Sequence, residues 1–174
     1  MLPRKTQEVW MARAAADGVG ATVGAVMTRA VITTSPEATI EEVAEILSRH
    51  HITGVPVVDD HQRVAGVVSE MDVVTKSGRL VKDIMTPEPA TVGEDVPLHE
   101  VADLLMGRRI RRLPVVRHGK LVGLISRTDL VLFFARHQWA CAACGATQRG
   151  LQPPAACPAC GREGFTLEAA PHGM

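Results

Sequence analysis

The sequence predicts an α+β protein, built from one βαββα unit that occurs twice and followed by a small module that contains four cysteines. Residues 26–74 align with residues 84–131, and in each copy the spacing of apolar residues changes in the same order between helical and strand-like. All four cysteines of the 174-residue chain fall between residues 141 and 160. Neither copy could cover its own sheet, so we expect the two to pack together as one pseudo-twofold unit.

The first copy begins with a short strand at about residues 31–33, which is followed by a helix at about residues 39–50. Apolar residues recur at helical spacing in this helix, at Ile40, Val43, Ala44 and Leu47. Two short apolar runs, residues 55–58 and 64–68, flank the turn-like segment DDHQ and predict a β-hairpin. A last helix begins at Ser69.

The second copy repeats these elements with one residue fewer between its two hairpin strands. A Met-Thr pair, a Pro-Val-Val strand and a Ser-x-x-Asp motif occur at equivalent positions in both copies. The predicted organisation is an N-terminal helical segment (residues 1–23, with a helix at about 5–16), repeat one (24–78), repeat two (79–136), the four-cysteine module (137–168) and a tail (169–174).

The four cysteines form two Cys-x-x-Cys pairs that are separated by twelve residues, and a glycine follows each pair. In each pair both thiolates can point at one ion, while backbone N–H groups of the tight turn donate to the sulfurs. Two disulfides are the alternative, but disulfides are rare in the cytoplasm, where we expect this chain. Four sulfurs take zinc or iron. We favour structural zinc, because so small a module rarely folds without a metal; its ligands would be Cys141, Cys144, Cys157 and Cys160.

The cysteine segment, residues 138–168, resembles the short rubredoxin-like ribbon at the end of rubrerythrins. The shared features are Trp139 before the first Cys-x-x-Cys pair, the twelve-residue gap, the sequence CPAC and a late aromatic residue, Phe165. The resemblance implies a small β module around a metal ion.

Residues 24–135 resemble a tandem pair of cystathionine-β-synthase (CBS) domains, known as a Bateman module. The Met-Thr, Pro-Val-Val and Gly-x-x-Ser-x-x-Asp signatures carry this resemblance, and each appears in both copies. It implies a regulatory protein that binds an adenine nucleotide or a related adenosyl ligand in the cleft between the repeats.

The resemblance also implies which residues bind the ligand. The Ser-x-x-Asp motif would hold ribose, small residues ahead of the Pro-Val-Val strand of the other repeat would face adenine, and nearby arginines would meet phosphate. The candidates are Ser126, Asp129, Ser69 and Asp72 for ribose, Thr53 and Gly54 for adenine, Arg127, Arg111 and Arg112 for phosphate, and Ser35 as a further nucleotide contact.

We expect the site on Ser126 and Asp129 to be the main one. It would face the small residues that precede the first Pro-Val-Val strand, whereas the other site would face two arginines. Glu70 also stands where the second copy has Arg127, and would repel a phosphate. A Ser-x-x-Asp sequence at a helix start is equally a capping box, so both roles stay open for each motif.

Composition and motif content exclude several classes of protein. Lys plus Arg equal Asp plus Glu at 19 each, which argues against binding of phosphate backbones by bulk charge. No apolar run approaches the ~20 residues that span a membrane, and the N-terminus lacks the apolar region of a signal peptide, so we expect a cytoplasmic protein. The sequence contains no HExxH, GxSxG, Walker A or GxGxxG motif, so we do not expect an enzyme.

Two further functions stay open from the sequence. The four-cysteine module could bind nucleic acid or act as a scaffold for an unidentified protein partner, although it carries no basic face. With iron in place of zinc it could carry electrons. We also expect a homodimer, because EVADLLM and DLVLFFA provide apolar helix faces and adjacent Phe133 and Phe134 would not both be buried within one small domain.

Overall fold

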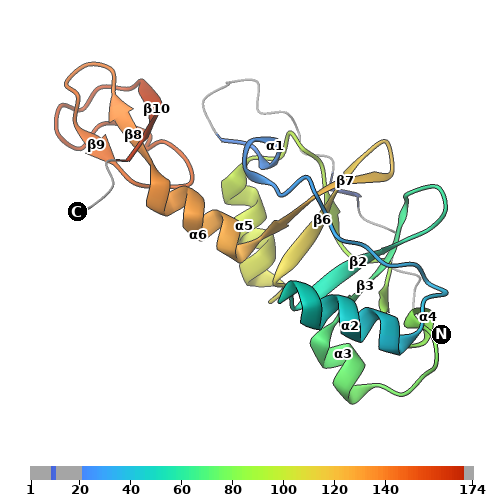
Figure 1. The fold of residues 1–174 in the computed structure, drawn as a ribbon. Helices are drawn as coiled ribbons and strands as arrows, with labels where there is room; N and C mark the ends of the chain where they lie inside the picture. Colours follow the sequence, from blue (N-terminus) through green and yellow to red (C-terminus); the bar gives the residue numbers. More distant parts are fainter. Residues whose placement is uncertain (1–8, 11–20, 171–174) are drawn as a thin grey trace. The chain divides into compact units, whose positions relative to one another are not determined.

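The structure is a computed structural model that describes residues 9–10 and 21–170 (Figure 1). The chain divides into two compact units, and each is assembled from separate stretches of sequence. Within the described residues, the first unit comprises 9–10, 28–92 and 113–124, and the second comprises 21–27, 93–112 and 125–170. Each unit therefore contains parts of both sequence repeats.

Helix α2 (Ile40–His50), in the first unit, begins with a capping box. The Oγ1 atom of Thr39 accepts a hydrogen bond from the backbone N–H of Glu42 at 3.2 Å. In return, Oε2 of Glu42 accepts one from the N–H of Thr39 at 2.8 Å. The helix ends at His51, whose left-handed φ of 51° closes it. Its apolar face carries Val43 and Leu47 into the core.

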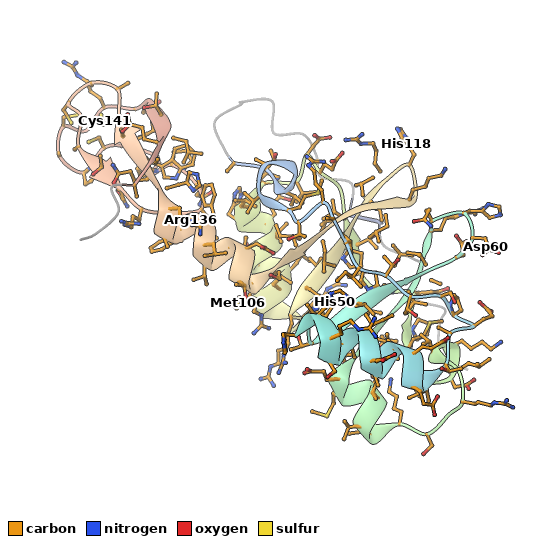
Figure 2. The ribbon with its side chains drawn as sticks, in the orientation of Figure 1. His50, Asp60, Met106, His118, Arg136 and Cys141 are labelled. Atoms are coloured by element: carbon orange, nitrogen blue, oxygen red, sulfur yellow. The ribbon has the colours of Figure 1, made fainter. Side chains whose placement is uncertain are left out.

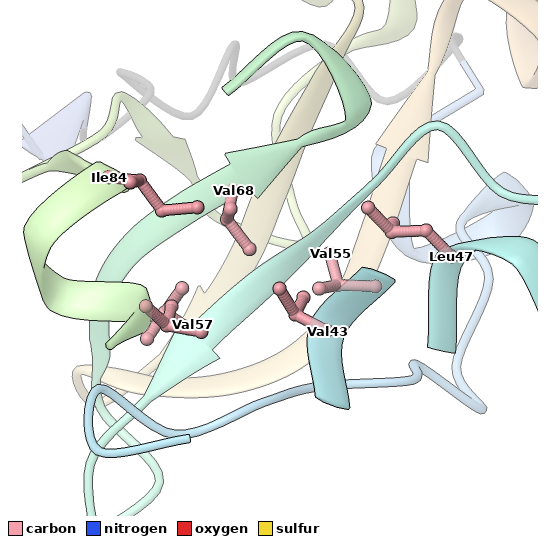
Figure 3. Packing of buried hydrophobic residues seen from close by; sticks show 7 residues of the cluster. Val43, Leu47, Val55, Val57, Val68 and Ile84 are labelled. Carbon is pink, nitrogen blue, oxygen red and sulfur yellow. The ribbon is translucent and has the colours of Figure 1, made fainter. Parts of the chain in front are cut away.

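The first unit contains an antiparallel sheet of strands β2 (Gly54–Val58), β3 (Val64–Ser69) and β4 (Thr86–Pro87), in that order. Strand β3 leads directly into helix α3 (Glu70–Thr75), and the short helix α4 (Val81–Ile84) precedes β4. Figure 3 shows how α2, α4 and this hairpin enclose one apolar core. The core residues are Val43, Leu47, Val55, Val57, Val68, Val81 and Ile84.

A second sheet has the strand order β1 (Val9–Trp10), β5 (Thr91–Val92), β6 (Arg112–Arg117) and β7 (Lys120–Ser126). Strand β5 pairs in parallel with β6 through Val92 and Val115. The first repeat has only an isolated parallel bridge between Thr34 and Val57 at the equivalent place. The strand expected at residues 31–33 is thus reduced to one bridge, one residue further along.

The second unit contains helices α1 (Val23–Val26), α5 (Leu98–Gly107) and α6 (Arg127–Arg136), with a small antiparallel sheet. The sheet has the order β10 (Phe165–Ala169), β8 (His137–Cys141) and β9 (Thr147–Gln148). Strand β8 starts directly after α6, as the orange segment of Figure 1 shows. The four-cysteine module therefore continues the last helix of repeat two without a linker.

Two local features differ from the sequence interpretation. Helices α1 and α4 were not expected; each is four residues long and ends at the methionine of a Met-Thr pair, Met27 or Met85. A helix was expected at residues 5–16, but residues 9 and 10 form strand β1, which pairs in parallel with β5. Edge pairing thus overrides local helical propensity at these two residues. The other residues of that prediction lie outside the described residues.

Candidate functional site

Both Ser-x-x-Asp motifs form the same capping box. At α6, Oδ2 of Asp129 accepts hydrogen bonds from the N–H and the Oγ of Ser126, both at 2.7 Å. At α3, Oδ2 of Asp72 accepts from the N–H of Ser69 at 2.9 Å and from its Oγ at 2.5 Å. The serine Oγ accepts the aspartate N–H in return, at 3.4 Å in the second repeat and 3.3 Å in the first. Each aspartate therefore uses one carboxylate oxygen for the helix cap and turns the other away from it.

The other oxygen, Oδ1, is where the two motifs differ. In the first repeat the Nζ of Lys76 lies 2.7 Å from Oδ1 of Asp72 and also donates to the carbonyl of Ile84 at 2.7 Å. The residue equivalent to Lys76 in the second repeat is Phe133, which cannot donate. Among the described residues, Asp129 has no hydrogen-bond or ion-pair partner beyond Ser126. Oδ1 of Asp129 is thus the acceptor that this helix cap leaves over.

The Lys76 pair also affects the proton affinity of Asp72. Burial by itself would raise the pKa of Asp72, but hydrogen bonds from Lys76 and Ser69 outweigh it and hold that pKa below the usual value. The Asp72 side chain is only 14% exposed, whereas that of Lys76 is 41% exposed. The carboxylate of the first motif is therefore charged, largely covered and already neutralised by a cation.

Each motif has a second backbone contact that is the same in both repeats. The N–H of Glu70, the first residue of α3, donates to the carbonyl of Thr53 at 3.3 Å. The N–H of Arg127, the first residue of α6, donates to the carbonyl of Arg111 at 3.2 Å. Within a unit, the structure thus brings Thr53 beside the first motif and Arg111 beside the second. The sequence analysis predicts instead that each Ser-x-x-Asp motif shares a ligand site with residues of the other repeat. That combination stays a prediction.

Gly54 and Arg112 follow these two residues, at the starts of β2 and β6. Gly54 pairs with Ser69 across the hairpin, and a Cβ added to it would lie 2.8 Å from the carbonyl oxygen of Val68. Only glycine fits this close approach of two strands. Arg111 is exposed, while Arg112 is half-buried.

The guanidinium of Arg127 has a structural task in this arrangement. Its Nε donates to the carbonyl of Ile110 at 2.9 Å, and its Nη2 donates to the carbonyl of Leu105 at 3.0 Å. These carbonyls lie in the last turn of α5 and in the loop after it, where helix carbonyls lack intrahelical partners. The phosphate role expected of Arg127 stays a prediction, and it would compete with these two bonds.

Ser35, the remaining nucleotide candidate, is exposed and lies in a groove that sequence reasoning did not foresee. The groove has a volume of about 540 Å³ and runs beside α2. It is lined by Thr34, Ser35, Glu37, Ala38, Glu42, Glu45 and Ile46. Three carboxylates in this lining oppose the approach of a phosphate group.

The four cysteine sulfurs gather at one end of the β10–β8–β9 sheet, where Figure 2 labels Cys141. All four Sγ atoms lie within 4.8 Å of one another, and the Cys141–Cys160 and Cys144–Cys157 distances are both 3.7 Å. A disulfide would need an S–S distance of roughly 2.05 Å. A metal ion bound tetrahedrally at ~2.3 Å sets its sulfurs about 3.8 Å apart. The sulfur positions therefore fit a four-coordinate metal ion and do not form disulfides.

The two Cys-x-x-Cys turns have the same backbone geometry. The N–H of Gly145 donates to the carbonyl of Cys141 at 2.9 Å, and that of Gly161 donates to the carbonyl of Cys157 at 2.8 Å. Both glycines have positive φ, 74° for Gly145 and 71° for Gly161, which other residues rarely adopt. The two turns thus present their sulfurs as equivalent pairs around one point.

The pKa values of two of the four thiols shift in opposite directions. Hydrogen bonds from the N–H groups of Ala143 and Cys144 lower the pKa of Cys141 to about 7. A backbone hydrogen bond from Arg162 also favours the thiolate of Cys160, but the neighbouring thiols and burial outweigh it and raise the pKa of Cys160 to about 12. The two shifts run in opposite directions, so negative charge on Cys141 disfavours it on Cys160, and a cation bound among the sulfurs would offset this repulsion.

The module is fixed to the C-terminal end of α6 by hydrogen bonds. Nη1 of Arg149 donates to the carbonyls of Phe134 at 3.1 Å and Ala135 at 2.6 Å. The N–H of Ala170 donates to the carbonyl of Arg136 at 2.7 Å. A cation and a donor thus satisfy the last carbonyls of the helix that begins at Ser126.

The structure resembles several solved CBS-domain pairs. CBSX2 from Arabidopsis thaliana has a TM-score of 0.61 and 34% identity, over 65% of this chain and 93% of that chain. A structure of CBSX2 in complex with AMP has a TM-score of 0.63 at 34% identity, over 65% of this chain and 95% of that one. The CBS domain pair of protein MJ0100, in complex with 5-methylthioadenosine and S-adenosyl-L-methionine, has a TM-score of 0.62 and 28% identity, over 66% and 96% of the two chains.

Curated relatives match over the same region. An inosine-5′-monophosphate dehydrogenase of Korarchaeum cryptofilum is 38% identical over 105 residues, which are 59% of this chain and 22% of the relative. The chloroplastic CBS domain-containing protein CBSX1 of Arabidopsis thaliana is 32% identical over 147 residues, covering 63% of this chain and 62% of the relative. The chain thus spans about a fifth of the dehydrogenase and three fifths of CBSX1.

The described helices include none whose length and apolarity would suffice to cross a lipid bilayer. The CBS domain family model matches twice, at residues 23–78 and 81–136, and its second match ends before the first cysteine. With both repeats matched over more than half of its length, this chain belongs to the CBS domain family.

Proposed function

We propose that this chain is a regulatory protein without catalytic activity that binds an adenosyl ligand through its CBS repeats, chiefly at Ser126 and Asp129. The observation that carries the proposal is the spare carboxylate oxygen of Asp129. Oδ2 of Asp129 caps α6, and Oδ1 has no partner among the described residues. A ribose with vicinal hydroxyls offers two donors to such an acceptor. The AMP complex of CBSX2 and the methylthioadenosine and S-adenosylmethionine complex of MJ0100 support this ligand class.

The identity of the phosphate contacts belongs to the same proposal. Arg111 is exposed beside the N-terminus of α6, and Arg112 follows it on β6. An AMP-type ligand would place its phosphate toward these arginines, with Thr53 and Gly54 as its adenine contacts. A ligand without phosphate, such as methylthioadenosine, would depend on the ribose and adenine contacts alone.

The proposal that this chain is not an enzyme is supported by its relatives. The inosine-5′-monophosphate dehydrogenase of Korarchaeum cryptofilum is matched over only 22% of its length. CBSX2 and the MJ0100 domain pair are instead matched over 93% and 96% of the solved chains. The cysteine module lies outside the two repeats. A tetrahedral ion bound by its four sulfurs would have no coordination position left for a substrate.

The four-cysteine module, in this proposal, is a rubredoxin-like ribbon that holds structural zinc and acts as the output or interaction element. Its own core is small: Trp139, Cys141, Cys157 and Phe165. A core of this size does not stabilise a fold by itself, so the metal supplies its folding free energy. Iron would instead make the module an electron carrier, and zinc with a protein or nucleic-acid partner would make it a scaffold. Arg149, one of its few cations, is engaged by the carbonyls of α6, which disfavours nucleic acid.

Calorimetric titration of the full chain with AMP, ADP, ATP, S-adenosylmethionine and methylthioadenosine tests the ligand proposal directly. We expect at least one of them to bind with a Kd below the millimolar range and to raise the melting temperature. Absence of both effects for all five at millimolar concentration would refute the ligand proposal and favour a role of the repeats as a scaffold for the cysteine module.

A further inference from the structure

The two ribose motifs differ four residues after their aspartate, at Lys76 in the first repeat and Phe133 in the second. We propose that Lys76 is a specificity-determining residue: by occupying Oδ1 of Asp72, it confines adenosyl-ligand binding to Ser126 and Asp129, so that each chain binds one ligand. This inference rests on the proposed function. It adds the reason why only one of two nearly identical Ser-x-x-Asp motifs would bind the ligand.

The ammonium of Lys76 is fixed in its place by two oxygen atoms. It lies 2.7 Å from Oδ1 of Asp72, at the i,i+4 spacing that brings side chains together on one helix face. It also donates to the carbonyl of Ile84, the last residue of α4, at 2.7 Å. Two elements, α3 and α4, therefore hold the ammonium beside Asp72.

A bound ribose would meet a carboxylate with little acceptor capacity left. Oδ2 of Asp72 already accepts from the N–H and the Oγ of Ser69, and Oδ1 faces the ammonium. The ribose hydroxyls would have to displace the ammonium from Oδ1, which exchanges an ion pair for a hydrogen bond from an uncharged donor, at a carboxylate that is only 14% exposed. Such an exchange is unfavourable, so the first motif keeps its cap and does not take a ligand.

The second motif lacks this obstacle. Phe133 is buried, at 4% exposure, and its ring stacks on His137 with centroids 4.6 Å apart. It therefore serves the packing of α6 and offers no hydrogen bond to Asp129. Among the described residues only Ser126 donates to the Asp129 side chain, which leaves Oδ1 to a ligand.

The experiment is a calorimetric measurement of stoichiometry with AMP and, in parallel, with S-adenosylmethionine. The parent chain should bind one equivalent of the ligand that it accepts. Lys76→Met, which keeps the aliphatic stem and removes the charge, should bind two, with affinity at the first repeat raised at least about tenfold over the parent. Lys76→Arg keeps the cation and should stay at one equivalent. Adding Asp72→Ala to Lys76→Met should remove the second equivalent again.

Lys82→Met is the matched control, because Lys82 is also half-exposed and its Nζ lies 3.9 Å from Oε1 of Glu37. It should bind one equivalent, which separates the loss of this particular cation from a general loss of positive charge. Lys76→Gln provides a second uncharged variant should Lys76→Met not melt cooperatively.

Two equivalents in the parent, or one in both uncharged Lys76 variants, would overturn the role of Lys76 while leaving the ligand proposal intact. If neither probe binds the parent or any variant, the proposed function itself falls, and the assignment of Lys76 falls with it.

Discussion

The Oγ of Ser126 lies 2.7 Å from Oδ2 of Asp129, and the same Oδ2 accepts the backbone N–H of Ser126. One carboxylate oxygen therefore closes the N-terminus of α6, and the other has no partner among the described residues. The cap that the structure shows and the ribose contact that we propose are therefore compatible, because a carboxylate has two oxygens. Their contributions can be separated by experiment.

Asp129→Ala should weaken the binding of an adenosyl ligand by tenfold or more, because it removes the acceptor of two charge-assisted hydrogen bonds from ribose. Asp72→Ala removes the same cap from α3, worth ~1 kcal/mol, together with the ion pair to Lys76, and is the control for a lost cap outside the main site. Differential scanning fluorimetry should show that ligand raises the melting temperature of the parent and of Asp72→Ala but fails to raise that of Asp129→Ala. Equal ligand-induced shifts in both variants would leave Asp129 with the capping role alone.

The arginines of the second repeat should fall into two classes. Arg112→Ala should weaken ATP and ADP more than adenosine, because the guanidinium of Arg112 would bind the phosphate groups that adenosine lacks. Arg127→Ala should instead lower the melting temperature by the same amount with and without nucleotide, because its guanidinium serves the carbonyls of Leu105 and Ile110. Titrations with adenosine and ATP, combined with melting curves, distinguish the two patterns. An Arg127→Ala variant with selectively weakened ATP binding would restore the phosphate role to Arg127.

Replacing Cys157 by serine should release the metal ion and unfold the cysteine module, while the first unit, whose core runs from Val43 to Ile84, stays folded. Elemental analysis of the parent should find one zinc per chain, and the absence of visible absorption should exclude iron. A chelator should reproduce the effect of the substitution, seen as loss of the buried environment of Trp139 in its fluorescence. Intact-mass measurement that found two disulfides and no metal would refute the metal centre.

The ion pair between Asp72 and Lys76 should stabilise the fold above about pH 4 and cease to do so in stronger acid. The pKa of Asp72 is held below its usual value in the folded chain, so its contribution is present above the unfolded pKa, ~3.9, and disappears as pH falls through the folded pKa. Asp72→Asn should therefore cost at most about 1 kcal/mol near neutral pH, since Lys76 is partly exposed, and nothing in strong acid. Urea unfolding across this pH range measures the difference in unfolding free energy between the parent and Asp72→Asn.

Lys76→Met removes the same ion pair from its other side. The difference in unfolding free energy between this variant and the parent should therefore also become smaller in acid. If Asp72→Asn lowers the unfolding free energy by the same amount from neutral pH to about pH 2, the ion pair is not the cause of the destabilisation.

The chain should be a dimer at micromolar concentration, because several large apolar side chains are exposed on its helices. On α6, Val131 is 65% exposed and Phe134 is 47% exposed; on α5, Met106, labelled in Figure 2, is 63% exposed. Burying such a surface against a second copy is favourable. Val131→Asp should shift light scattering from dimer to monomer, whereas Val74→Asp, on the exposed face of α3, tests whether that helix takes part. A parent that scatters as a monomer would refute the dimer.

The parts of the fold that could be predicted from sequence depend on local patterns. The helix at residues 39–50 and the hairpin after it follow from apolar spacing, and α2 (Ile40–His50), β2 and β3 occupy these places. Phe133 is buried and Phe134 is exposed, in agreement with the expectation that both would not be buried in one small domain. The cysteine spacing likewise brought four sulfurs together, because each tight turn brings its two cysteines close.

The parts that could not be predicted depend on partners that are distant in sequence. The strand at Val9–Trp10 exists through pairing with Thr91 and Val92, which no local pattern indicates. The hydrogen bonds of Arg127 to the carbonyls of Leu105 and Ile110 span 22 and 17 residues. Lys76 is different, because its i,i+4 spacing from Asp72 is visible in the sequence and could have identified the pair.

Arg149 and Ala170 supply donors to the carbonyls of Phe134, Ala135 and Arg136. These hydrogen bonds connect residues on both sides of residue 136, where the second CBS family match ends. The end of that match is therefore not a structural boundary. A chain shortened at that boundary would keep both repeats but leave the last carbonyls of α6 without these donors, which favours fraying of the helix end. Residues beyond 136 therefore complete the hydrogen bonding of the last turn of the helix that begins at Ser126.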